Sequence, residues 1–144
     1  MRFSSLLGAL VLAVSLLCPT HHKDAKTTKT SSMELMQEQL VNDFYHFNNG
    51  YFDGNLPPTK ISYTYSISGD IGDSLCDLDD SGIVKTNCLI IINGYYDRSQ
   101  READLTLFHE MCHVATPIEI PDHGPKWQAC MHNLANENAF NDLW

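Results

Sequence analysis

The sequence predicts a small α+β domain: a helix, three strands in an antiparallel or mixed sheet, then two more helices. Three observations predict it. Apolar residues recur with helical spacing in residues 33–51, and apolar and polar residues alternate in residues 61–67. Helix-start signals then precede two later apolar stretches, from residues 99 and 123. With 144 residues, the chain has room for one domain.

The first 32 residues are expected to lie outside that domain. A positive charge at Arg2 precedes the 16-residue uncharged run Phe3 to Cys18, which is short for a membrane span of about 20 residues. We predict a signal peptide over residues 1–20, export to the periplasm or the extracellular space, and no stable membrane insertion. An uncleaved anchor is the alternative. The polar residues 21–32 predict a flexible linker, which leaves 33–144 as the domain.

The first helix is expected from Met33 to Tyr51, with Ser31 or Ser32 as its cap and Asn48-Asn49-Gly50 as its end. The alternating stretch Ile61–Ile67 predicts the first strand.

A loop is expected over residues 69–73. The next two strands, residues 74–78 and 87–93, should form a hairpin that turns at Gly82. The turn segment Asp77–Gly82 resembles the start of a calcium-binding EF-hand loop. However, Cys88 stands where such a loop needs its last glutamate, so we interpret the segment as an acidic turn.

The second helix is expected to run through Ala103–Ala115, with Ser99 as cap and Glu102 completing a capping box. After a loop with two prolines, His123-Gly124-Pro125 should open the last helix, because proline is favoured in a first turn.

Charge argues against a nucleic-acid partner. Residues 33–144 hold five Lys and Arg against seventeen Asp and Glu, a balance of −12. Nucleic-acid surfaces need clustered basic residues, and this region has no such cluster.

Cysteine usage predicts disulfides. An even number of cysteines follows the N-terminal segment, namely Cys76, Cys88, Cys112 and Cys130. Cys76 and Cys88 each lie six residues from Gly82, so they should face each other across the hairpin. Cys130 lies on the apolar stripe of the last helix, from which it can reach Cys112. Four buried thiols are the alternative.

The most informative stretch is His109-Glu110-Met111-Cys112-His113, an H-E-x-x-H motif on the second helix. Residues four apart in a helix lie one turn above each other, about 6 Å along the axis. Two imidazoles at that spacing can bind one Zn²⁺, and Glu110 would then be placed to take a proton from a water activated by the zinc.

A catalytic zinc site needs a third protein ligand. We choose His123, because the turn that precedes a new helix can aim its side chain at the metal. The downstream alternatives that stay open are Glu119, Asp122, His132 and Glu137.

The motif followed by His123-Gly124-Pro125-Lys126-Trp127 resembles the SprT-like zinc metallopeptidases, which carry H-E-x-x-H and then H-G-x-x-W or H-G-x-x-F. The stretch from Phe47 to Pro57 is similar to the family's F-N-x-x-Y-F-x-x-x-L-P, and Ile61–Tyr65 to its following strand. The likeness spans about residues 38–136. It implies a zincin-like core, one zinc held by His109, His113 and His123, Glu110 as general base, and proteolysis.

The family's DNA-repair role is not expected here, because the acidic chain shows neither a zinc ribbon nor a basic region after the motifs. We therefore predict a metalloendopeptidase acting on protein or peptide substrates. The alternative is a non-catalytic exported binding module stabilised by zinc. Trp127 is expected to pack behind the site. Tyr95 and Tyr96 are expected to pack at a strand end, with a role at the oxyanion as the alternative.

Overall fold

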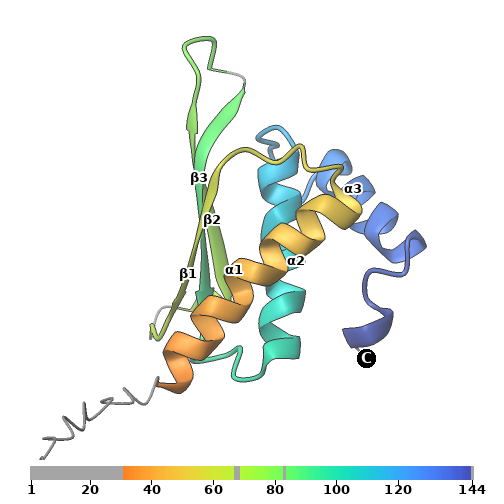
Figure 1. Cartoon of the computed structure of the whole chain (residues 1–144). Helices are drawn as coiled ribbons and strands as arrows, with labels where there is room; N and C mark the ends of the chain where they lie inside the picture. Colours follow the sequence, from red (N-terminus) through yellow and green to blue (C-terminus); the bar gives the residue numbers. More distant parts are fainter. Residues whose placement is uncertain (1–30, 67–68, 83, 144) are drawn as a thin grey trace, which may run out of the picture.

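The structure is a computed structural model that describes residues 31–66, 69–82 and 84–143 (Figure 1). The expected signal peptide, residues 21–30 of the expected linker and the expected strand end at Ile67 lie outside the described residues. No helix in the described part of the chain is both long enough and apolar enough to cross a bilayer.

Helix α1 spans Ser32–Tyr51 and begins with a capping box. The Ser31 hydroxyl accepts the Glu34 N–H at 3.2 Å, and the Glu34 carboxylate accepts the Ser31 N–H at 2.7 Å. The expected linker was therefore two residues too long, because Ser31 and Ser32 belong to the start of this helix. Leu40, Phe44 and Asn48, each four residues apart, form its buried face.

Asn48 directs the chain from α1 toward the sheet. Its carbonyl accepts the N–H groups of Phe52 and Gly54, and its side-chain oxygen accepts the Leu56 N–H at 3.2 Å. Asp53 and Gly54 have positive φ angles of 55° and 70°. Glycine adopts this conformation without a steric penalty, and aspartate tolerates it better than most residues. Asp53 and Gly54 therefore favour the reversal of chain direction after α1.

The strands β1 (Thr59–Thr64), β2 (Gly72–Leu78) and β3 (Lys85–Asn93) form one sheet in the order β1-β3-β2. β1 is parallel to β3 and β2 is antiparallel to it, so the sheet is mixed. Four strand boundaries were predicted wrongly. β1 begins earlier and ends at Thr64, β2 takes in two residues of the expected loop at 69–73, and β3 begins two residues before Asn87.

The hairpin between β2 and β3 has the expected register, with Cys76 opposite Cys88. Asn87 is an extra residue in β3 with a φ angle of 47°, which marks a bulge beside this pair. In the turn, the Asp79 carboxylate accepts the Ser81 hydroxyl at 2.6 Å and the Val84 N–H at 3.2 Å. That carboxylate therefore closes the turn of the hairpin.

The second helix, α2, spans Gln100–Ala115 and is capped by Ser99 with the predicted box to Glu102. Helix α3 spans Pro125–Asn136, and a short 3-10 helix, η1, spans Asn141–Leu143. Proline occupies the first turn of α3 as expected. These elements confirm the predicted α+β class and the order of its parts.

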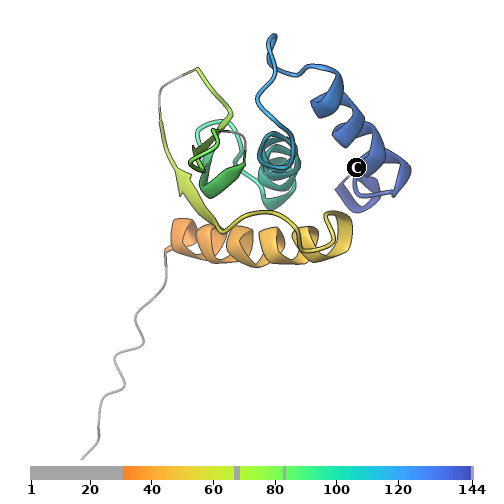
Figure 2. The ribbon, with the colours of Figure 1, turned by 90° about the horizontal axis from the view of Figure 1, so that it is seen from above.

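Helix α2 lies in the centre of the fold (Figure 2). The sheet packs on one side of it, α3 on the other, and α1 runs across both α2 and the sheet. The larger apolar cluster fills the space between α1, α2 and the sheet; its members include Leu40, Phe44, Ile61, Ile90, Ile92, Leu107 and Met111. A smaller cluster joins α2 to α3 and the C-terminal residues, around Phe108, Cys112, Leu134 and Ala139.

Two disulfides reinforce these layers, and both are the pairings expected from the sequence. Cys76–Cys88 joins β2 to β3, and Cys112–Cys130 joins α2 to α3. Disulfides persist in oxidising surroundings, so they indicate that the chain works outside a reducing compartment.

A buried carboxyl at the interface of α1 and α2 should make stability depend on pH. Burial raises the pKa of Asp104 to about 7, against a weaker opposing hydrogen bond from Gln100, and nearby Asp43 raises it further. The folded state therefore holds this proton more tightly than the unfolded chain, whose aspartate has a pKa of 3.8. We expect the contribution of Asp104 to the free energy of unfolding to fall by about 1–2 kcal/mol as the pH rises from about 4 to about 7.

Urea denaturation of the metal-free protein across this pH range measures the effect. Asp104→Asn should make the decline smaller, leaving the part that comes from buried Glu110, while Asp80→Asn, which alters an exposed hairpin carboxyl, should leave the decline unchanged. Parallel pH profiles for the parent protein and Asp104→Asn would contradict the assignment.

Candidate metal centre

A cavity of about 510 Å³ lies between β2, the C-terminal half of α2 and the loop that leads to α3. We call it the metal cleft. β2 and the residues before it supply one wall and the loop of residues 116–123 supplies the other, with α2 as the floor. The charged and histidine residues that line it are Asp70, Asp73, Lys85, His109, Glu110, His113, Glu119, Asp122 and His123.

Three imidazoles converge in the metal cleft. His109 and His113 lie one turn apart on α2, and their Nε2 atoms are 3.3 Å apart. His123 comes from the loop, and its Nε2 lies 3.0 Å from that of His109. The ligand atoms of all three lie within 4.8 Å of one another. Nitrogens bound tetrahedrally at about 2.1 Å lie about 3.4 Å apart, so this cluster could hold one divalent metal ion.

The loop reaches the cluster because its ends are anchored. Gly124, the N-cap of α3, has no side chain to cap the helix. The Glu119 carboxylate replaces it by accepting the N–H groups of Lys126 at 3.1 Å and Trp127 at 2.9 Å. His123 itself has a φ angle of 60°, and its carbonyl accepts the Gln128 amide at 2.9 Å. These contacts turn its ring back toward α2.

Trp127 packs against all three rings. Its ring centroid lies 4.7 Å from that of His109, 4.3 Å from that of His123 and 5.5 Å from that of His113. Its indole N–H donates to the His109 carbonyl at 3.3 Å. Trp127 therefore supports the cluster by packing, as expected, and it also lines the metal cleft.

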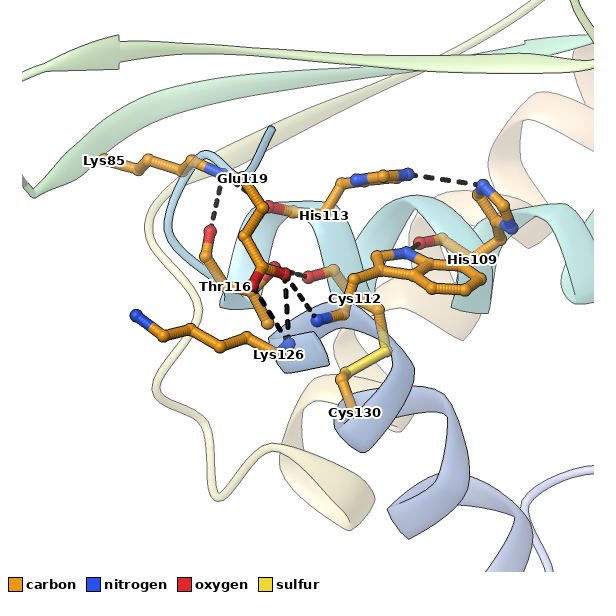
Figure 3. Close-up of a disulfide and its surroundings, with 9 residues drawn as sticks. Lys85, His109, Cys112, His113, Thr116, Glu119, Lys126 and Cys130 are labelled. Carbon is orange, nitrogen blue, oxygen red and sulfur yellow. Dashed lines mark hydrogen bonds between the residues drawn. A yellow bond between two sulfur atoms is a disulfide. The ribbon is translucent and has the colours of Figure 1, made fainter. Parts of the chain in front are cut away.

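Two charged residues hold His113 in position, one through its ring and one through its main chain. The Asp122 carboxylate lies 3.5 Å from His113 Nδ1, the nitrogen that faces away from the cluster. This is the arrangement in which a carboxylate orients a metal-binding imidazole. The Lys85 ammonium donates to the main-chain carbonyls of His113 and, at 2.7 Å, of Thr116 (Figure 3). It thereby satisfies two of the carbonyls left free at the end of α2.

Glu110 lies beside the cluster and is only 5 % exposed. It lines the metal cleft and faces β2 at Gly72. A Cβ atom at Gly72 would lie 2.7 Å from the Glu110 carboxylate oxygen and 2.6 Å from Thr106. Only glycine therefore allows β2 to approach α2 this closely, and this approach encloses the carboxylate.

The electrostatics of the metal cleft suit metal binding with an adjacent base. Burial raises the pKa of Glu110 to about 7, opposed by a hydrogen bond from Ser74 and supported by the charges of Asp73 and Asp122. Burial, together with repulsion from the other two imidazoles, lowers the pKa of His109 to about 4. A neutral imidazole is the form that binds metals, and a carboxyl with a near-neutral pKa can both accept and release a proton at pH 7.

The other sequence candidates do not join the cluster. Of the alternatives for the third ligand, Glu119 caps α3 and Asp122 contacts His113 instead. His132 and Glu137 are exposed, and neither lines the metal cleft. Tyr95 and Tyr96 pack edge to face at the end of β3, away from the metal cleft.

Sequence reasoning missed the parts played by Gly72, Lys85 and Glu119. One signal existed for Glu119, since a helix capped by glycine needs an acceptor from elsewhere.

Comparison with known proteins agrees with this geometry. The SprT-like family model matches residues 40–142, which is 103 of the 144 residues, and includes every residue of the histidine cluster. Neither the comparison with curated proteins nor that with solved structures found a match. Because one family model covers most of the domain, including helices α2 and α3 and the loop between them, the chain belongs to the SprT-like family.

Proposed function

We propose that this chain is a zinc-dependent metalloendopeptidase. One observation carries the proposal: three imidazole nitrogens converge beside a buried carboxyl in an open cleft. Zinc is the metal that a three-histidine site with a free position suits best. Membership of the SprT-like family supports the same chemistry, because the motifs at His109–His113 and His123–Trp127 resemble those of SprT-like zinc metallopeptidases.

In this proposal His109, His113 and His123 hold the zinc, one ion per chain. When bound, zinc supplies Lewis acidity toward water and toward a peptide carbonyl. Glu110 accepts the proton that water loses as it attacks the carbonyl, and it then donates that proton to the leaving amine. The close approach of Gly72 encloses the Glu110 carboxyl, and the raised pKa of this buried carboxyl supports its role as both acceptor and donor of the proton.

Casein hydrolysis by the purified protein tests the function. Activity should disappear with a zinc chelator and return when Zn²⁺ is added. If the protein binds about one zinc per chain and cleaves neither casein nor a peptide library, it is the non-catalytic binding module instead.

Two carboxylates on the β2 side of the metal cleft favour basic substrates. Among the described residues, the carboxylates of Asp70 and Asp73 form no hydrogen bond or ion pair, whereas Glu119 and Asp122 are engaged in the site. The cleft's one lysine, Lys85, is already bound to main-chain carbonyls. The wall therefore offers two free negative charges to a Lys or Arg side chain of a peptide.

We expect kcat/KM for a peptide with Lys or Arg near the cleaved bond to exceed that for its Gln counterpart by about threefold to tenfold. The double variant Asp70→Asn with Asp73→Asn should abolish the difference, while Asp77→Asn with Asp80→Asn in the hairpin should retain it. High salt should weaken the preference. Equal rates for the two peptides with the parent protein would contradict it.

We further propose that the chain is exported, with residues 1–20 as its signal peptide. The two disulfides support an oxidising destination. N-terminal sequencing of the protein recovered from an exporting cell tests this.

A further inference from the structure

The three proposed ligands come from two separate parts of the fold. His109 and His113 are on α2, which is packed on several sides and supplies much of the core. His123 is exposed and lies in the loop immediately before α3. The position of the third imidazole therefore depends on how firmly α3 is held against α2.

The apolar contacts that hold α3 are few. Leu134 is the one fully buried residue of this helix, and Trp127, Cys130 and Met131 are only partly buried. Because the hydrophobic effect scales with the apolar area removed from water, an interface with one fully buried side chain holds α3 only weakly by itself. The Trp127 indole adds one hydrogen bond to α2, and Glu119 joins the loop to α3 rather than to α2.

A disulfide connects the two parts at this place. Cys112 is completely buried, directly precedes His113 and is bonded to Cys130 (Figure 3). Cys130 lies about one turn after Trp127 in α3. The bond closes a loop with a sequence separation of 18. That closed loop contains His113, His123 and Trp127, together with Glu119 and Asp122. A crosslink of this kind lowers the conformational entropy available to the loop when its other contacts open.

We propose that the Cys112–Cys130 disulfide is the positioning element for the third metal ligand, so that metal affinity depends on its oxidation state. The inference rests on the metal site of the proposed function. A dithiol reductant breaks the S–S bond: its two electrons and two protons convert the cysteines to thiols, and the dithiol closes to its own disulfide. α3 is then held by its small apolar interface and the Trp127 hydrogen bond, and His123 is free to leave the other two imidazoles. The protein would thus bind its metal tightly only in an oxidising compartment.

The second disulfide provides a matched control within the same chain. Cys76–Cys88 joins two strands that a hydrogen-bond ladder already holds in register, and its closed loop has a sequence separation of 12. None of the three histidines lies in that loop. Loss of either bond should lower the thermal stability, but only loss of Cys112–Cys130 should loosen the cluster.

The test compares Cys112→Ala with Cys130→Ala against Cys76→Ala with Cys88→Ala. Zinc affinity is measured by competition with a chromophoric chelator, and coordination is followed through the visible bands of the Co²⁺ form. We expect the first double variant to bind zinc about 10–100-fold more weakly, as is typical when support for a ligand is lost. Its Co²⁺ bands should also weaken or shift. The zinc affinity of the second double variant should stay within about threefold of that of the parent protein when both are measured at the same temperature without denaturant.

Two results would overturn the inference: parental zinc affinity in the first variant, or equal weakening in both. If the first variant does not fold, the variant Cys76→Ala with Cys88→Ala provides a second test, because Cys112–Cys130 is then its one remaining disulfide among the described residues. In it, a phosphine reductant, which takes oxygen from water to become its oxide, should release zinc to the chelator, and reoxidation should restore binding. No release on full reduction would again overturn the inference. These readouts do not use hydrolysis, so a protein that binds zinc through this disulfide and cleaves nothing would refute only the proposed function.

Discussion

Replacement of Glu110 with glutamine should lower peptide hydrolysis by about 10²–10⁴-fold while zinc stays bound, because general acid–base catalysis contributes about that factor. Glutamine has nearly the same shape as glutamate, so it should fill the space against Gly72 without moving β2. Its amide cannot accept a proton from water at neutral pH. The measurements are kcat/KM on a fluorogenic peptide and the zinc content of the purified variant.

Glu137→Gln is the matched control, since this glutamate is exposed beyond the end of α3 and lies away from the metal cleft. It should hydrolyse the peptide at the parental rate. Full activity in Glu110→Gln, with zinc bound, would show that another group takes the proton.

Replacement of His123 with asparagine should weaken zinc binding by about a hundredfold or more. Zinc binds to sites of about four ligands with a free energy of about 10–16 kcal/mol. The loss of one ligand should therefore lower the affinity by more than one factor of about ten. Asparagine is preferable to alanine here, because His123 has a φ angle of 60° and asparagine adopts that backbone conformation readily. The loop should therefore keep its path while it loses the imidazole.

Competition with a chelator gives the affinity, and the Co²⁺ spectrum reports the change in coordination. His132→Asn serves as the control, because His132 lies exposed on α3 and does not line the metal cleft. Should His132→Asn weaken binding and His123→Asn leave it unchanged, the choice of third ligand would be wrong.

Much of the fold could be read from the sequence because it depends on neighbours. Ser31 with Glu34 and Ser99 with Glu102 each form a capping box within four residues, so both helix starts are local features. The register of Cys76 with Cys88 likewise follows from the distance of each to the turn. The strand boundaries were less certain, because alternation shows which face a residue occupies and not where pairing stops.

The parallel pairing of β1 with β3 could not be predicted in this way. The alternation in β1 shows that Ile61 and Tyr63 face the core, but it does not name a partner strand. The chain passes from β1 to the far edge, forms β2, and returns through the hairpin to place β3 in the middle. That order is decided by which arrangement buries β3 between both neighbours and under the helices.

The sequence by itself determined the helix-and-strand order, the two histidines one turn apart and the glutamate between them, because each follows from contacts a few residues long. Tertiary structure alone decided the direction of the His123 ring, the approach of Gly72 to Glu110, and the contacts of Asp122, Lys85 and Glu119. These join residues that are far apart along the chain. Their distances are set by how α2 packs against β2 and α3, and a linear pattern of residue types carries no measure of that packing.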